Sequence, residues 1–580
     1  MTSLNLSRGI KKHPYISAFI LWLYLFLAFG YFDVEKVVTL SFILPMLIAG
    51  ILAYIYFLRK EKLRRIPEKK RKSPLLALGV AVYSLLMVYS FSIFPTDDFI
   101  KSRNSFVPLI FLLAGLIAWC VYLTVKKKWS VNRIILCIFL FSCIIHLFFL
   151  LTAKFNVVMQ DMGSIGENGD GHFGYISYLY NHLLPAQFDP RERWQFYHPP
   201  LFYYSAALLF RVLSFFGIRL QTAIYNIQFL NMLYIMFVSV CFYKIASLFR
   251  TKKLPMILAF SVFTLSPTMD YVALLQSSDI LAFLFFMLCV YYTIVWYRDQ
   301  RAKHILKIAL CFGLGMLSKM SVALAALPIA VVFIYALIQK LRIKDMKSFG
   351  RLFGQMCAFL GVAAPLSLYW SLRNLIRFGV PLGYVPLSSL EPIQNPVSQR
   401  LFDYFSPGQY TNPFFNTIAV DSFDEYNPII ALIKTSASDF GVERARTGMI
   451  LGYAVLLFTA AVAVASFVFM IYVIVRKNTI SGLAKAFFSV MYIEYIYSYL
   501  SFCINFPHYC TEQIRYAMPL IMIGALFIGF GIRELQKSRR RQAKAVVRAV
   551  SVMVFAFSFV AAAVVLRIGT MITIDWLMTK

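Results

Sequence analysis

Acidic residues and histidines gather in one polar segment of the chain, between about residues 154 and 199. The segment holds five of the 26 acidic residues and three of the seven histidines: Asp161, Glu167, Asp170, Asp189, Glu192, His172, His182 and His198. Asp161 and Asp170 lie in glycine-rich stretches behind a long apolar run, where a carboxylate next to water can take a proton from an incoming hydroxyl. The segment therefore predicts a general base. The alternative is a loop that is simply polar.

Five further charged residues lie at the ends of later apolar runs: Asp279 in LLQSSDILAF, Lys319 in GMLSKMS, Arg373 and Arg377 in WSLRNLIRFGVPLGY, and Arg515 in EQIRYAMPL. Lys and Arg side chains bind phosphate groups through charge-assisted hydrogen bonds. The four basic residues are therefore candidates for holding a phosphate. Charges at the ends of apolar runs also serve as membrane anchors, which is the alternative for each of them.

Two ionisable residues, Glu494 and His146, fall inside apolar runs. A glutamate in such a run is a functional hypothesis by default, because its burial in hydrocarbon is costly. A hydrogen bond to Tyr492, Tyr495 or Tyr497 would instead give Glu494 a structural role. His146 is expected to have a packing role.

The elements that carry these residues are membrane-spanning helices. Of the 580 residues, 60% are hydrophobic and only 14% are charged, which is far from the balance of a soluble globular protein. Long apolar runs are each sufficient to cross about 30 Å of hydrocarbon as a helix. The first five of them cover residues 15–32, 37–58, 75–94, 106–125 and 134–153. Ten further crossings are predicted at residues 221–248, 254–267, 280–297, 305–317, 322–338, 352–372, 448–475, 484–503, 517–532 and 550–565.

The formal net charge of +31 does not indicate a nucleic-acid partner. Lys and Arg occur in short clusters between apolar runs rather than along one polar face, as in RKEKLRRIPEKKRK at residues 59–72. Such clusters mark the cytoplasmic ends of membrane helices. The nine cysteines show no CxxC and no metal-ligand spacing, so neither a disulfide framework nor a zinc site is predicted.

Placing the basic clusters inside gives about fifteen crossings and two long outer loops, at about residues 154–220 and 377–446. Residues 198–220 begin with two prolines after His198 and contain Arg211 and Arg219, which favours a helix in the outer interface over a further crossing. The predicted fold is an all-α polytopic membrane protein. Residues 1–133 form an N-terminal transmembrane extension of about 4 helices, and residues 134–580 form a core of about 11.

From about residue 134 onward, the chain resembles polyprenyl-phosphate-sugar-dependent glycosyltransferases of the GT-C fold class, which include protein O-mannosyltransferases and lipid A aminoarabinose transferases. The motifs that carry the resemblance are GHFGYI in the acidic outer loop, HPPL, SDILAF, LSK, RNLIRFGVPLGY and RYAMPL. Each motif is weak alone, and their order, spacing and common sidedness make the match more specific. The core is therefore expected to be a GT-C-type catalytic bundle.

The resemblance implies an inverting, single-displacement transfer in which a carboxylate removes the proton of the acceptor while polyprenyl phosphate leaves. Family members commonly carry Asp-Glu early in the first outer loop, and this chain has no such dipeptide there. The nearest matches are Asp161 and Asp170, and the choice between them stays open. The residues that the resemblance assigns to substrate binding are His172, His198, Asp279, Lys319, Arg373, Arg377 and Arg515. Among these, Lys319, Arg373 and Arg515 would neutralise the departing phosphate.

The expected partners are a polyprenyl-phosphate-linked sugar, an acceptor protein, lipid or glycan, and the bilayer itself. Some relatives need a divalent metal and others do not, and no specific ligand set indicates one here. The expected location is a bacterial plasma membrane, with the active site on the extracytoplasmic side. Three other interpretations remain: a transporter or flippase of lipid-linked sugars, which would place charged or broken helices near the midplane, a polysaccharide polymerase or ligase, and a non-catalytic membrane protein of the same fold.

Overall fold

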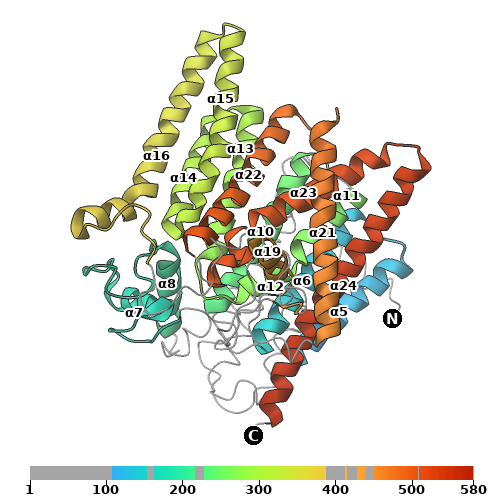
Figure 1. Cartoon of the computed structure of the whole chain (residues 1–580), viewed down its shortest axis with the longest axis horizontal. Helices are drawn as coiled ribbons and strands as arrows, with labels where there is room; N and C mark the ends of the chain where they lie inside the picture. The colour runs from blue at the N-terminus through green and yellow to red at the C-terminus, as the bar shows by residue number, and fades with distance from the viewer. Residues whose placement is uncertain are drawn as a thin grey trace, which may run out of the picture. The chain divides into compact units, whose positions relative to one another are not determined.

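A computed structural model describes residues 107–152, 162–215, 227–251, 253–386, 412–414, 427–438, 448–506 and 509–578. Within these ranges the regular structure consists of α-helices and short 3₁₀ segments, and no strand occurs (Figure 1). The prediction of an all-α polytopic membrane protein is confirmed. Residues 1–106 lie outside the described ranges, as does the expected four-helix extension apart from its last run.

The chain divides into two compact units, one of residues 1–121 and 208–229 and one of residues 122–207 and 230–580. The first unit contributes most of α5 (Val107–Val125) and the C-terminal half of α8 (Leu201–Phe215) to the described part. Large apolar side chains such as Ile117 and Val212 are exposed on these helices, as expected for surfaces that face lipid. The proposed boundary after residue 133 stays a prediction.

The second unit contains the remaining helices and all residues of the candidate site that the structure describes. They are α6 (Val131–Thr152), α7 (Gly171–His182), α10 (Ile227–Leu248), α11 (Leu254–Thr264), α12 (Pro267–Leu274), α13 (Asp279–Asp299), α14 (Ala302–Ser318), α15 (Ala326–Arg342), α16 (Met346–Phe378), α19 (Pro428–Ala437), α21 (Met449–Val475), α22 (Gly482–Asn505), α23 (Pro519–Gln536) and α24 (Arg541–Met578). Three 3₁₀ segments, η3 (Met320–Ala325), η4 (Tyr509–Glu512) and η5 (Ile514–Tyr516), connect some of them.

Nine helices in the described residues are long and apolar enough to cross a membrane, and a bent pair would make a tenth. That pair is α11 and α12, which meet at 40° where a single crossing over residues 254–267 is expected. Ser266 has an extended backbone, and Pro267 opens α12 at a helical position where its missing N–H costs nothing. The span is therefore broken rather than continuous.

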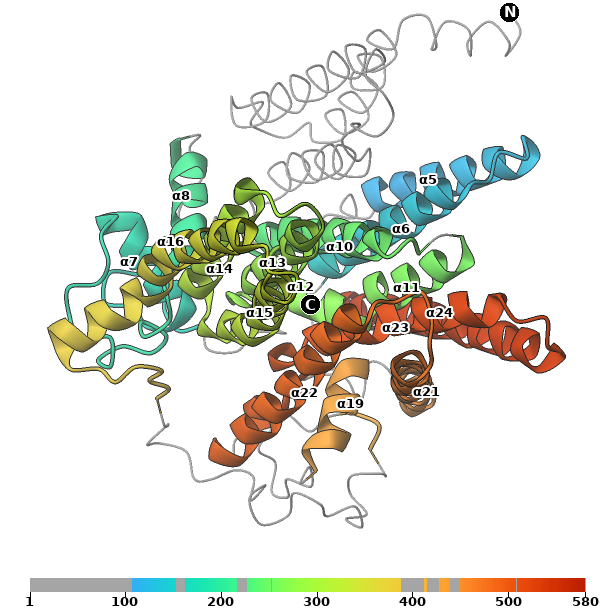
Figure 2. The same ribbon diagram turned by 90° about the horizontal axis from the view of Figure 1, so that it is seen from above.

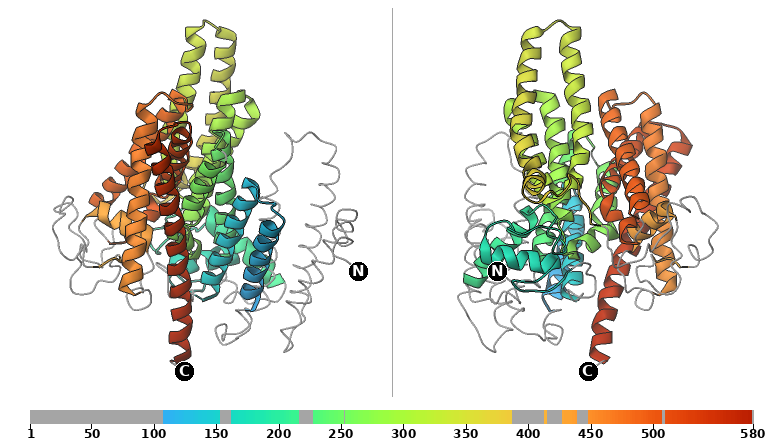
Figure 3. Two further views of the ribbon diagram at one scale, coloured as in Figure 1. Left: turned by 90° about the vertical axis from the view of Figure 1, so that its right-hand side faces the viewer. Right: turned by 60° about the vertical axis from the view of Figure 1, so that its left-hand side comes forward.

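The helix α16 is longer than the predicted crossing over residues 352–372. It begins at the N-cap Asp345, whose carboxylate accepts a hydrogen bond from the backbone N–H of Ser348 at 3.0 Å. It ends at Gly379, which adopts a left-handed φ of +66° that glycine tolerates without strain. Together α15 and α16 form an antiparallel pair joined by a short turn (Figure 3).

Helices pack in two groups in the second unit: α13, α14 and α16 contact one another in series, and α11, α21, α23 and α24 form the other group (Figure 2). Glycines bring the backbones close. A Cβ atom on Gly313 would lie 2.5 Å from Cβ of Leu366, and one on Gly531 would lie 2.2 Å from the ring of Phe469. Small residues at helix contacts are typical of membrane proteins, in which van der Waals packing drives association.

A buried polar chain joins α6 to the break between α11 and α12. The Nδ1 atom of His146 lies 2.6 Å from Oδ1 of Asp270, and both side chains are at most 5% exposed. On the other side of the ring, Nε2 lies 3.1 Å from Oγ of Ser142, which donates to the carbonyl of Thr264 at 3.2 Å. His146 is thus held by hydrogen bonds to partners that sequence analysis did not identify, and its expected packing role stays a prediction.

We expect His146→Leu to lower the free energy of unfolding by about 3 kcal/mol, because it leaves the Asp270 carboxyl buried without a partner. Replacing both residues, as His146→Leu/Asp270→Leu, should recover most of that loss, since no buried polar group then remains. Unfolding in detergent measures both values. As a control, His182→Leu breaks the exposed His182–Glu167 pair and should change stability little. If His146→Leu costs no more than this control, the buried pair contributes nothing.

Candidate functional site

Asp279 and Lys319 form a buried ion pair at one end of the second unit. Asp279 opens α13, where the partial positive charge of the helix N-terminus stabilises a carboxylate. Its Oδ1 atom pairs with the ammonium group of Lys319, and its Oδ2 atom accepts a hydrogen bond of 2.7 Å from Oγ of Ser277. The side chains are 4% and 15% exposed, so this pair is largely removed from solvent.

Lys319 reaches the start of α13 because of where α14 ends. The helix stops at Ser318, and Lys319 takes an extended backbone (φ −159°, ψ 136°) before η3 begins at Met320. The turn between the two helices thus directs a lysine into the protein. Burial lowers the pKa of Lys319, the ion pair with Asp279 opposes this, and Arg515 lowers it further.

Arg515 lies in η5, and both it and Lys319 contact the ring of Tyr516. The charged groups of both residues lie 5.0 Å from the centroid of Tyr516, a distance typical of cation–π contacts. Arg515 is 8% exposed. Two cations and one carboxylate therefore face a common region, and an added anion would be stabilised there.

His198 is electrostatically coupled to the same group of residues. Burial lowers the pKa of His198 well below its usual value, and the charges of Lys319, His172 and Arg515 lower it further while Asp279 opposes them. Its imidazole ring is therefore neutral and can both donate and accept a hydrogen bond. We call Asp279, Lys319, Arg515, Tyr516 and His198 the Asp279 cluster.

Aromatic packing fixes His198 and His172 in the first outer loop. The rings of the two histidines stack with centroids 6.4 Å apart, and Nδ1 of His172 lies 2.9 Å from the hydroxyl of Tyr203. The hydroxyl of Tyr175 donates to the carbonyl of His198 at 3.3 Å, and its ring stacks on that of Tyr203. Pro199 then leads into α8. Both predicted histidines thus belong to one packed layer.

Asp170 has a different setting. It is the exposed N-cap of α7, and its Oδ1 atom accepts a hydrogen bond of 3.3 Å from the backbone N–H of Ser164. Gly163, at φ +63°, lies so close that a Cβ atom would overlap the Asp170 carbonyl. The carboxylate therefore shapes its own loop, and its hydrogen bonds do not lead to the Asp279 cluster. Asp161 lies outside the described residues.

Arg373 and Arg377 contact the first outer loop from α16. Arg373 donates to the backbone carbonyl of Ala186 and to Oδ1 of Asn374, the latter at 2.7 Å. Arg377 donates to Oε1 of Gln187 at 2.7 Å. Each arginine thus already has a hydrogen-bond partner within the protein. Their role in phosphate binding stays a prediction.

Two more hydrogen bonds join the C-terminal end of α16 to the same loop, and we call this set of contacts the clamp. The indole N–H of Trp370 donates to the carbonyl of Tyr197 at 2.9 Å. In the opposite direction, Arg191 of the loop donates to the carbonyl of Phe378 at 2.9 Å. The C-terminal end of α16 thereby holds the segment that leads to His198.

Glu494 lies midway along α22, and the structure does not give it the tyrosine partner that would explain it structurally. Its Oε2 atom is buried and makes no hydrogen bond within the described part of the chain, including to Tyr492, Tyr495 or Tyr497. The hypothesis that this intramembrane carboxyl is functional therefore stands as a hypothesis.

An apolar cavity of about 240 Å³ adjoins η5. Its lining comes mainly from α19, α21, α22 and α23 and includes Ile514, the neighbour of Arg515. Further lining residues are Leu432, Val462, Phe467, Tyr492, Leu520 and Phe527. A cation thus lies next in sequence to the wall of an apolar cavity within the membrane-spanning unit.

Sequence analysis missed Asp270 and Tyr516. Asp270 carried a usable signal, because it is an acid inside an apolar stretch and such residues need a partner. Tyr516 carried none, since a tyrosine beside an arginine is unremarkable in a chain with 35 tyrosines. No group of three or more His, Cys, Asp or Glu side chains is arranged to hold a metal ion in the ranges that the structure covers.

Residues 197–370 match the family model of dolichyl-phosphate-mannose-protein mannosyltransferases. The resemblance inferred from the motifs is confirmed over this segment, which contains His198, Asp279 and Lys319. No curated protein matches the chain. The family match supports a multi-pass membrane glycosyltransferase of the GT-C type.

The neutral state of His198 predicts a loss of stability in acid. The unfolded chain binds a proton at this histidine below about pH 6.5, whereas the folded chain does not until its much lower pKa is reached. The contribution of His198 to the free energy of unfolding is therefore fully present above the pKa of the unfolded chain. Below that pKa, the free energy of unfolding falls by about 1 kcal/mol per pH unit. His198→Gln should remove this dependence. Unfolding measured at pH 7.5 and 5.5 tests it, and parallel losses in parent and variant would contradict it.

Proposed function

We propose that the chain transfers one sugar from a polyprenyl-phosphate donor to an acceptor at the extracytoplasmic face, with inversion at the anomeric carbon. The observation that carries this proposal is the buried Asp279–Lys319 pair with Arg515 at its side. Both members of the pair lie within the family-matched segment, and Arg515 lies beyond it. The catalytic core proposed for this activity is residues 134–580.

The chemistry that this arrangement suits is the departure of a phosphate. As the acceptor oxygen forms its bond to the anomeric carbon, the bond to the phosphate oxygen breaks and the electron pair stays on polyprenyl phosphate. The leaving group gains one negative charge, which Lys319 and Arg515 would stabilise in a site with little water. Asp279 holds Lys319 in place and is available to a hydroxyl of the sugar or acceptor.

The apolar cavity beside η5 supports a lipid-linked donor. A donor phosphate at Arg515 would place the first part of its chain next to Ile514, on the cavity wall. The rest of a polyprenyl chain is far larger than 240 Å³ and would remain in the bilayer. This arrangement explains why cations and apolar side chains meet in one place.

The general base belongs to the first outer loop in this proposal, as either Asp161 or Asp170. Asp170 would have to exchange its contact with Ser164 for the acceptor hydroxyl. Asp161 follows the end of α6 by nine residues in the sequence and lies outside the described residues. The surrounding His172 and His198 would orient the acceptor or sugar.

A transporter of lipid-linked sugars is the second candidate, and Glu494 is the observation that favours it. Its Oε2 atom has no hydrogen-bond partner among the described residues, and such an acid midway along a membrane-spanning helix is typical of transport pathways. The glycosyltransferase has more support, because the other described site residues lie near the ends of their helices.

For the base, we expect one of Asp161→Asn and Asp170→Asn to abolish transfer while keeping donor binding. The assay uses purified protein, radiolabelled polyprenyl-phosphate hexoses and membrane extract as acceptor source, and it measures sugar transfer and release of polyprenyl phosphate. Glu192→Gln, an exposed acid of the same loop, is the matched control and should retain activity. If both aspartate variants equal the parent, the base is wrongly assigned. Transport without donor cleavage would favour the transporter.

For the phosphate site, we expect Lys319→Met to lower kcat by about 100-fold, the usual loss when one stabilising donor is removed. This variant also leaves Asp279 unpaired, so Asp279→Asn/Lys319→Met serves as the partner variant that restores neutrality. A folded but inactive double variant supports direct phosphate stabilisation. Lys347→Met, an exposed residue of α16, is the control. Recovery of activity in the double variant would reduce the pair to a structural role.

A further inference from the structure

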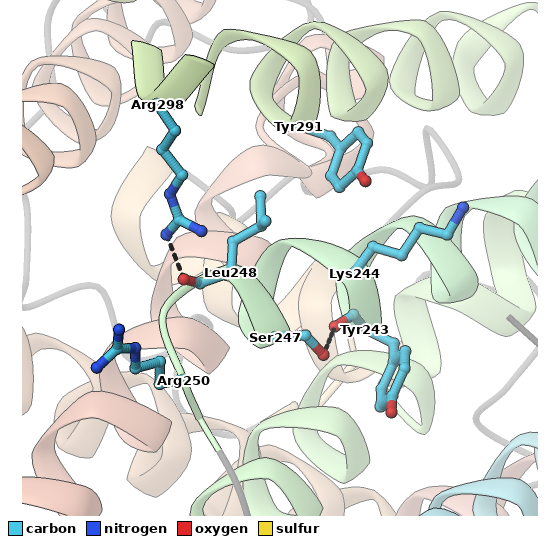
Figure 4. A pocket seen from close by; sticks show the side chains of 7 residues that line it. All are labelled: Tyr243, Lys244, Ser247, Leu248, Arg250, Tyr291 and Arg298. Carbon is cyan, nitrogen blue, oxygen red and sulfur yellow. Dashed lines mark hydrogen bonds between the residues drawn. The ribbon is translucent and has the colours of Figure 1, made fainter. Parts of the chain in front are cut away.

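A basic pocket of about 630 Å³ lies at the other end of α13 from the Asp279 cluster (Figure 4). Its lining residues are Tyr243, Lys244, Ser247, Leu248, Arg250, Tyr291 and Arg298. Asp279 and Arg298 are 19 residues apart on one helix, which separates them by about 28 Å. The pocket is therefore distinct from the proposed site, and the positive-inside rule assigns this end to the cytoplasmic face.

The charge of the pocket is unbalanced. Three of its seven lining residues are cationic and none is acidic. Arg250 lies close enough to Arg298 to repel it electrostatically. Asp299, the residue that follows Arg298, has partners elsewhere: its carboxylate lies 3.1 Å from Nε2 of His304 and 3.7 Å from Nε of Arg301.

In the described part of the chain, the contacts that join α10 and α13 at the pocket leave most N–H groups of its cations free to bind a ligand. Arg298 reaches from α13 to donate to the Leu248 carbonyl at the end of α10, as Figure 4 shows, and this uses one of its five N–H groups. Lys244 lies 5.8 Å from the Tyr291 ring centroid. Neither Lys244 nor Arg250 makes a side-chain hydrogen bond within the described ranges.

Cations at helix C-termini also compensate the helix dipole, and basic residues here also anchor the protein. Those roles require neither a shared cavity nor cations placed where they repel one another. An anion in the pocket would remove the repulsion between Arg250 and Arg298 and could accept a hydrogen bond from the hydroxyl of Tyr291, whereas the hydroxyl of Tyr243 donates to Oδ1 of Asn132 at 3.3 Å. The volume falls within the usual range of small-ligand sites, about 300–1,000 Å³.

We propose that this pocket binds a phosphate-bearing anion at the cytoplasmic face. Basic pockets between membrane helices bind anionic lipid headgroups, and a soluble phosphate ester offers the same chemistry. The proposal does not rest on glycosyl transfer, because the pocket shares no residue with the Asp279 cluster.

The experiment measures lipid retention by the full chain, using native mass spectrometry after extraction from nanodiscs of phosphatidylglycerol or phosphatidylcholine. A second arm measures the thermal unfolding midpoint with and without inorganic phosphate. We expect Lys244→Gln/Arg250→Gln to bind phosphatidylglycerol about tenfold more weakly than the parent. Neither substitution removes a hydrogen bond of the described chain, so folding should be unaffected.

The matched control is Arg342→Gln/Lys344→Gln, which removes two exposed cations at the α15–α16 turn, also assigned to the cytoplasmic side. Selective loss of phosphatidylglycerol in the pocket variant supports a lipid headgroup as the ligand. Selective loss of stabilisation by inorganic phosphate supports a soluble phosphate ester. Equal losses in both variants, or no preference for phosphatidylglycerol and no effect of phosphate, would overturn the proposal.

Discussion

The absence of water from the bilayer core constrains this structure more than any other condition. A charged or polar group that enters it is costly unless it has a partner within the protein, because hydration is not available there, and Oε2 of Glu494 is an exception among the described residues. The two buried acid–base pairs satisfy this demand in different ways. His146 and Asp270 connect α6 to α12, whereas Lys319 and Asp279 lie beside Arg515 and His198. Buried ion pairs are weak evidence for stability alone, so the second pair is better explained by what it can bind.

The need to satisfy buried polar groups also applies to the bent pair α11 and α12, which precedes Asp279 in the chain. When α11 ends at Thr264, its last carbonyls lose their helical partners, and Ser142 satisfies one of them. The chain then continues through α12 directly to Ser277 and Asp279. The end of α11 is therefore stabilised in part by a side chain of α6.

Much of the fold follows from the sequence, because long apolar runs and basic clusters have only a few arrangements in a membrane. Each of the eleven crossings expected for the core overlaps an observed helix, although α14 has only 17 residues and the crossing at residues 254–267 is bent. The site was less predictable. The sequence identified Asp279, Lys319 and Arg515 by their positions at helix ends, but it could not reveal that Lys319 and Arg515 share the ring of Tyr516, because such pairing depends on packing between distant segments. For Arg373 and Arg377 the sequence did not reveal the partners in the loop, since hydrogen bonds to a backbone carbonyl or an amide leave no pattern.

The clamp between α16 and the first outer loop has a consequence for building chimaeras with related proteins. Trp370, Arg373 and Arg377 hold the loop, and the carbonyl of Phe378 receives a hydrogen bond from it, although about 180 residues separate the two segments. A loop transplanted alone would lose its register on the recipient, whatever its own sequence. The exchangeable module is therefore discontinuous: the loop together with the last turns of α16.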